Sequence, residues 1–186
     1  MRRSLAAALI LLTFYALAYA QEHSPRTSRT QPAQPTNTPD DWTTFNSPIG
    51  HFSILMPVVP KETIKTTDSE HGPYTSYTYI AKGQSVYAVG WVDYDPAFNF
   101  NRLAELEANR DNLIKGLQAT LLNTKTVIVD GYQAIDFTAE TADQTLKSRV
   151  YMVGRRPYQL VAITSKGSDD SINVARFFAS FKVKPQ

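Results

Sequence analysis

The chain has 186 residues, with 19 Lys and Arg, 17 Asp and Glu, and no cysteine. This length fits one domain of ordinary size with short extensions. The lack of cysteine excludes disulfides, thiolate metal sites, lipidated thiols and cysteine nucleophiles. If a leader carrying Arg2 and Arg3 is removed, 17 basic residues face 17 acidic ones, and we therefore expect no nucleic-acid binding.

Residues 1–20 have the pattern of a secretory signal peptide. Arg2 and Arg3 precede the apolar run Leu5–Leu17, and Ala18–Ala20 fits an A-x-A cleavage site. The apolar run is shorter than the roughly 20 residues of a membrane-spanning helix. We therefore expect an exported protein, periplasmic or extracellular, with no transmembrane span after cleavage; an uncleaved N-terminal anchor is the alternative.

Residues 21–41 predict a disordered linker. They hold four of the 11 prolines among Ser, Thr, Gln and Asn, and they contain no aliphatic residue larger than Ala. Such a segment buries too little apolar surface to offset the entropy lost on ordering. We interpret it as a flexible tether to a single domain over residues 42–186.

The domain is predicted to open with a turn and a strand. Pro48 and Gly50 suit a turn, with Gly50 supplying a positive φ angle. In Phe52–Met56, alternate residues are large and apolar, which is typical of a strand with one buried face. Glu62–Thr67 predicts a short edge strand guarded by lysines.

A hairpin of Tyr74–Ala81 and Gln84–Tyr94 follows, rich in Tyr, Val, Thr and Trp. Both faces of the second strand carry large side chains, so we expect this strand to be central and covered on both sides.

A long helix is predicted over Asn101–Ala119, because apolar residues recur at three- and four-residue spacing. Asn101 suits the N-cap, although a start at Asp95 and Pro96 is also open. Arg110 interrupts the apolar stripe. We expect it either to extend its charge to solvent or to pair with a carboxylate beneath the helix.

Four more strands and a helix complete the domain. The alternation and the tight-turn sequences predict strands over Thr124–Asp130, Tyr132–Glu140, Thr145–Val153 and Tyr158–Lys166. A final helix is predicted over Asp169–Phe181, capped by Ser168, with phenylalanines on its buried side. Consecutive strands joined by tight turns indicate an antiparallel β-sheet flanked by helices, an α+β fold.

Two segments carry a family resemblance. Trp42–Pro60, with its Phe-Ser-Ile-Leu-Met-Pro core, and Ala175–Phe181, with its Phe-Phe-x-Ser-Phe pattern, resemble uncharacterised exported bacterial proteins that share a motif close to F-S-V-L-M-P-G-x-P. Val58 stands where that group often has Gly. The order of elements resembles the Mog1/PsbP-like α/β sandwich. This resemblance implies protein binding, as in Ran-binding and photosystem-II-associated members, and it transfers no functional residue.

The chemistry-bearing motifs of enzymes are missing from the sequence. His23, His51 and His71 are isolated from one another, and Asp93 and Asp95 lack the further oxygen ligands of a calcium loop. There is no G-x-S-x-G elbow and no glycine-rich phosphate loop. We therefore expect no metal, no cofactor and no catalytic residues, and hence a protein that is not an enzyme.

Two groups of residues remain as candidate partner-binding sites. Lys147, Arg149, Arg155 and Arg156 lie in one predicted hairpin, where they would suit an acidic partner or an anionic head group, although such charges also occur in solvated turns. The second group is aromatic, and its members either form an interface or are cross-strand pairs that stabilise the sheet: Tyr77, Tyr79, Tyr87 and Trp91.

Two functions remain open. The first is a non-enzymatic envelope module that binds a protein or another envelope component through its sheet face or hairpin tips. The alternative is a small-ligand carrier or cryptic hydrolase with a pocket between helix and sheet, lined by Arg110, His51 or Tyr87.

Overall fold

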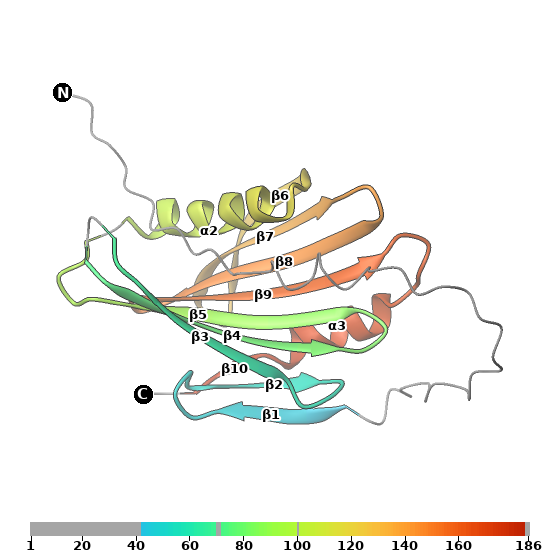
Figure 1. Ribbon diagram of the computed structural model, residues 1–186, viewed down its shortest axis with the longest axis horizontal. Helices are drawn as coiled ribbons and strands as arrows, with labels where there is room; N and C mark the ends of the chain where they lie inside the picture. Colours follow the sequence, from blue (N-terminus) through green and yellow to red (C-terminus); the bar gives the residue numbers. More distant parts are fainter. Residues whose placement is uncertain (1–41, 70–71, 100, 185–186) are drawn as a thin grey trace, which may run out of the picture.

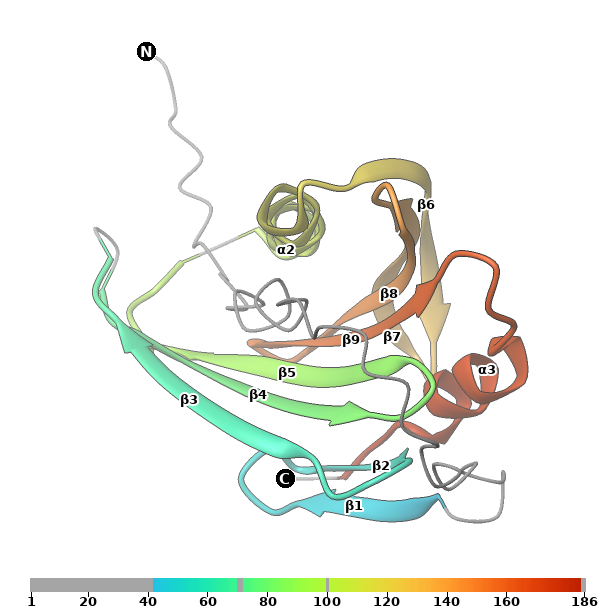
Figure 2. The ribbon, with the colours of Figure 1, turned by 45° about the vertical axis from the view of Figure 1, so that its right-hand side comes forward.

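The computed structural model describes residues 42–69, 72–99 and 101–184. The predicted signal peptide and linker, residues 1–41, lie outside the described residues. The described part of the chain forms three layers (Figures 1 and 2). A seven-stranded sheet lies in the middle, with helix α2 (Arg102–Leu117) on one face and a three-stranded sheet and helix α3 (Ser171–Ser180) on the other.

The described residues form five strands, a helix, four strands, a second helix and a short last strand. In chain order they are β1 (Thr43–Ser47), β2 (Phe52–Met56), β3 (Lys61–Thr67), β4 (Tyr74–Lys82), β5 (Val86–Tyr94), α2 (Arg102–Leu117), β6 (Thr120–Val129), β7 (Tyr132–Glu140), β8 (Gln144–Val153), β9 (Arg156–Ser165), α3 (Ser171–Ser180) and β10 (Lys182–Val183).

The large sheet has the order β3-β4-β5-β9-β8-β7-β6, and each strand runs antiparallel to its neighbours. Strand β5 lies inside the sheet with both faces largely buried, which confirms the prediction of a central strand. The tight turn at Asp130 and Gly131 is also confirmed, because both residues have positive φ angles, 52° and 81°. Strand β6 begins at Thr120, four residues earlier than predicted, and carries a register shift between Leu121 and Asn123.

The small sheet pairs β2 with β1 on one side and with β10 on the other. Phe52, Ile54 and Met56 are buried on one face of β2, as the alternation predicts. The prediction of a positive φ at Gly50 was wrong, because the left-handed residue is His51, with a φ of 52°. Gly50 is required for space, since a Cβ there would lie 2.5 Å from the Phe52 ring.

Helix α2 confirms the predicted helix with slightly shorter bounds. Asn101 is the N-cap, and its side-chain oxygen accepts a hydrogen bond of 3.1 Å from the Ala104 amide. The helix ends where Gln118 adopts a left-handed conformation. Arg110 pairs with Asp111 of the same helix and donates to Thr124, so it does not reach a carboxylate beneath the helix.

The start of α3 differs from the prediction. Ser168 is not the cap, because Asp170 occupies that position. The Asp170 carboxylate makes no capping hydrogen bond and instead accepts hydrogen bonds from Tyr87 and Asn173. Asp169 and Asp170 therefore precede the helix. The predicted apolar side is confirmed, since Phe177 and Phe178 are buried and Phe181, just past the helix, is buried as well.

The sheet separates two cores. The core toward the small sheet and α3 is aromatic and contains Phe52, Tyr87, Trp91, Tyr158 and Phe177 among others. The core toward α2 is mainly aliphatic. Among the described residues, no helix has the length and apolar character needed to cross a membrane.

Candidate functional site

The β8–β9 hairpin tip is held by arginine side chains that reach neighbouring loops. The turn contains Gly154, whose φ of 62° suits a residue without a Cβ. Arg155 donates through Nη2 to the carbonyl oxygens of Asp95 and Phe98, in the segment between β5 and α2. These contacts hold the hairpin tip against the segment that follows β5, at the end of the molecule opposite α3 (Figure 1).

Arg156 makes a second set of contacts on the other side of the tip. Its Nε donates to Asp93 Oδ1 at 2.6 Å, and its Nη1 donates to the Ile49 carbonyl at 3.1 Å. The guanidinium lies 5.8 Å from the Trp91 ring and 6.0 Å from the Tyr158 ring. Burial acts to lower the pKa of Arg156, but the hydrogen bond to Tyr158 and the charge of Asp93 outweigh it and raise the pKa. Arg156 therefore stays charged.

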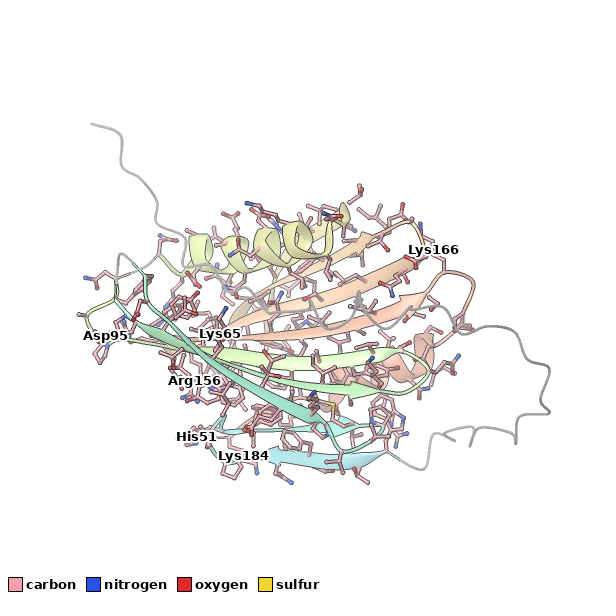
Figure 3. The ribbon with its side chains drawn as sticks, in the orientation of Figure 1. His51, Lys65, Asp95, Arg156, Lys166 and Lys184 are labelled. Atoms are coloured by element: carbon pink, nitrogen blue, oxygen red, sulfur yellow. The ribbon has the colours of Figure 1, made fainter. Side chains whose placement is uncertain are left out.

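A surface hollow of about 660 Å³ opens beside these two arginines. Its polar lining includes Asp93, Arg155, Arg156 and Lys184. Asp93 is already paired with Arg156, and the exposed Lys184 ammonium is bonded to the Asn46 side-chain oxygen. Figure 3 shows Arg156, Lys184 and His51 at this end, with Lys166 at the opposite end. The described lining of the hollow therefore brings three cationic side chains and one carboxylate together.

Arg149 lies on the same β8–β9 hairpin as Arg155 and Arg156, as predicted, but it is not part of the group at the tip. It lies in the middle of β8, where it donates through Nε and Nη2 to the two carboxylate oxygens of Asp136 on β7, the second at 2.7 Å. These hydrogen bonds raise the pKa of the guanidinium above its ordinary value. Arg149 lines a different hollow, of about 330 Å³, with Lys125 and Lys147. Arg149 is separated from the tip because β8 and β9 are each ten residues long, and a residue in the middle of such a strand lies far from the turn that joins the two.

The aromatic candidates pack mostly inside the molecule. Tyr87 and Trp91 are 1% and 2% exposed, and Tyr79 is also buried. Tyr77 faces Trp91 directly across β4 and β5, and their rings stack with centroids 4.5 Å apart. This bears out the cross-strand alternative for that pair. Only Tyr77 keeps a partly exposed side chain, so the buried three provide no contact surface in this conformation.

Buried polar residues on the inner face of α2 were not predicted from the sequence. Glu105 is 3% exposed, and its carboxylate accepts hydrogen bonds from Tyr94 and from Asn109. Burial raises the pKa of Glu105. Glu105, Asn109 and Asn112 follow helical spacing beside Leu106 and Leu113, which is the signal that could have placed them on the inner face.

The described residues hold no cluster of three or more metal-ligating side chains. Asp95 directly follows the last residue of β5. Its Oδ1 accepts a 2.8 Å hydrogen bond from the Ala97 amide and so caps the turn after the strand. The pocket residues expected for a small-ligand carrier are spread over the molecule. Tyr87 lies in the aromatic core, Arg110 lies at the surface of α2, and His51 lies in the β1–β2 turn.

Comparison with known proteins adds information about the fold. Neither the protein-family models nor the curated proteins include a match to the sequence. A solved structure of cyanobacterial PsbP (CyanoP) from Synechocystis sp. PCC 6803 is similar, with a TM-score of 0.53 at 10% identity over 77% of this chain and 92% of that one.

Weaker likenesses extend to a Bacteroides thetaiotaomicron protein (TM-score 0.37, 12% identity, 78% of this chain and 50% of that one) and to a protein of unknown function from Pseudomonas aeruginosa (0.36, 11%, 74% and 92%). The likeness to CyanoP, together with the antiparallel sheet and its two flanking helices, shows that the chain has a PsbP-like α+β fold.

Proposed function

We propose that this protein is an exported, non-enzymatic module that binds an acidic segment of another envelope protein at the hollow beside the β8–β9 hairpin tip. The observation that carries the proposal is the cationic rim of that hollow, formed by Arg155, Arg156 and Lys184. One carboxylate lies among them, and Arg156 already neutralises it. An acidic segment would be complementary to this cationic lining.

The arginines are held in place before any partner arrives. Arg155 is fixed by two backbone carbonyls, and Arg156 by Asp93, Ile49 and the Trp91 ring. A prearranged side chain loses little conformational entropy on binding, and this lowers the cost of association. Charged side chains at such a rim also increase the rate of encounter with an acidic partner.

The test is a photo-crosslink placed beside the hollow in the protein's own host. Ile49 is 55% exposed, and its carbonyl contacts Arg156, so a photoreactive residue at position 49 would report on this surface. We expect a crosslinked adduct that disappears when Arg155→Glu and Lys184→Glu are combined. The matched control is Lys82→Glu, an exposed lysine at the end of β4, which should leave the adduct intact.

The outcome separates binding from folding. The thermal unfolding of each variant is measured alongside, so that loss of the adduct is interpreted only in folded protein. An adduct that survives the double charge reversal would refute the proposed site. Export is tested in the same cells, because a mature protein of residues 21–186 in the periplasm or medium would support it, and a protein retaining residues 1–20 would indicate an anchor.

A further inference from the structure

Strand β6 forms an outer edge of the seven-stranded sheet, and no described residue pairs with its outer side. All seven residues of 120–126 are exposed. An edge strand presents unpaired N–H and C=O groups that can template another strand. After the register shift between Leu121 and Asn123, residues 123–129 keep a continuous register with β7 and are long enough to hold an added segment by backbone hydrogen bonds.

The two edges of this sheet are protected to different degrees. Strand β3, at the opposite edge, carries Lys61, Glu62 and Lys65 among seven residues, a common defence against unwanted pairing. Strand β6 has one charged residue, Lys125, among ten. It also exposes large aliphatic side chains, with Leu122 at 56% and Ile128 at 69%. The register shift between Leu121 and Asn123 interrupts only the start of this edge, so residues 123–129 of β6 stay open for pairing.

A row of alternating charge runs across the sheet and ends at this edge. In the strand register Arg149 faces Asp136, and Asp136 faces Lys125. Asp136 is held by two hydrogen bonds from Arg149, which leaves Lys125 as the unmatched last member. Among the ion pairs of the described residues, none involves Lys125 or the nearby Lys147, and both lysines line the 330 Å³ hollow.

We propose that the β6 edge accepts an extended segment of a partner protein as an eighth strand, with an Asp or Glu opposite Lys125. The carboxylate would continue the row of alternating charge, since opposite charges on facing residues stabilise a strand pair. Aliphatic residues at the ends of the segment would cover Leu122 and Ile128. Backbone hydrogen bonds would supply affinity, and the charge at the centre would supply register.

A second copy of this chain fits the edge poorly. Strand β6 contains no acidic residue. Two β6 strands could pair antiparallel with Leu122 of one copy opposite Ile128 of the other. In that register the two Lys125 side chains would face each other. Like charges placed directly opposite destabilise a strand pair. This surface is separate from the hairpin-tip hollow, so the proposal goes beyond the function proposed above and does not depend on it.

Two synthetic peptides test the proposal. Each is nine residues of alternating Thr and Val with lysine ends, and the centre is Glu in one and Lys in the other. The isotopically labelled full chain, purified from its own host, is titrated with each peptide and followed by backbone amide NMR. We expect shifts confined to β6 and its neighbour β7, and a roughly fivefold tighter binding of the Glu peptide.

A charge swap decides whether Lys125 sets this preference. In Lys125→Glu the Lys peptide should bind more tightly than the Glu peptide, and in Lys125→Gln the two should bind equally. The matched control is Lys65→Glu on the β3 edge, which should keep the original preference. A Glu peptide with alternate N-methylated amides, which cannot form the ladder, should not bind.

Three outcomes would overturn the proposal. The first is equal binding of both peptides to the natural protein, and the second is amide shifts at the β3 edge or elsewhere in place of β6. The third is a concentration-dependent dimer whose β6 amides are protected from exchange, because it would assign the edge to a second copy. Folding of each variant is checked from the unchanged amide spectrum of β4 and β5.

Discussion

The two faces of the central sheet are covered in different ways. On the face toward β2 and α3, the Phe52 ring lies 5.5 to 6.5 Å from five other aromatic rings. On the face toward α2 the contacts are mainly aliphatic, and buried polar atoms of Asn109, Asn112 and Gln159 have no hydrogen-bond partner among the described residues, against one such atom, of Asn173, on the α3 side. Unpartnered buried polar atoms cost free energy, so α2 should be the less firmly attached layer.

The largest expected effect comes from emptying the aromatic core. Phe52→Ala should lower the free energy of unfolding by about 4 kcal/mol, because it removes a fully buried ring and leaves a cavity. The matched change beneath α2 is Leu106→Ala, which we expect to cost about 3 kcal/mol at the same zero exposure. Urea unfolding measures both. A larger loss from Leu106→Ala would contradict the comparison.

Two glycine substitutions should act in opposite directions on the two faces. In Gly50→Ala the new Cβ would lie 2.5 Å from the Phe52 ring, and we expect a loss of about 2 kcal/mol from overpacking. In Gly116→Ala, within α2, nothing lies within 4 Å of the new Cβ. A gain of about 0.5–1 kcal/mol is therefore expected from helix propensity. Equal effects of the two changes in thermal unfolding would show that the crowding at Gly50 is relieved elsewhere.

The smallest expected effect is a pH dependence of the unfolding free energy that comes from Glu105 on the inner face of α2. Burial raises the pKa of Glu105, so its folded pKa lies above the unfolded value. The stabilisation from this group is then complete below the unfolded pKa of about 4.5, and is lost as pH rises through the folded pKa. Glu105→Gln should remove this fall from the unfolding free energy measured against pH. A fall of the same size in the variant would exclude Glu105 as its source.

Local sequence patterns predicted most of the fold. The alternation in Phe52–Met56, the cap at Asn101 and the turn at Asp130 each depend on neighbouring residues, and each was confirmed. Strand β1 has a single large apolar residue, Phe45, and β10 has only two residues. Both exist because β2 lies between them and pairs with each. The pairing of β1 with β2 crosses the adjacent turn, whereas β10 pairs with a strand near the other end of the chain, and such long-range pairing leaves no local pattern to detect.

The candidate site was predictable only in part. Adjacent arginines in a turn sequence correctly indicated a charged hairpin tip. Apart from Tyr158, however, the hydrogen-bond partners described for Arg155 and Arg156 lie 57 to 107 residues away in the chain. Asp170 looked like a first-turn acid of α3, yet it accepts a hydrogen bond from Tyr87, 83 residues earlier. The partner-binding role of these residues stays a prediction.

The order of the small sheet has a mechanical consequence. Strands β1 and β10 both run antiparallel to β2 and so point in the same direction on either side of it. A tension applied between Trp42, before β1, and Lys184, after β10, would draw these two strands in opposite directions along their length. The hydrogen bonds to β2 would then be loaded together in shear and would not open one at a time. A domain pulled at its two ends would thus resist through its smallest sheet first.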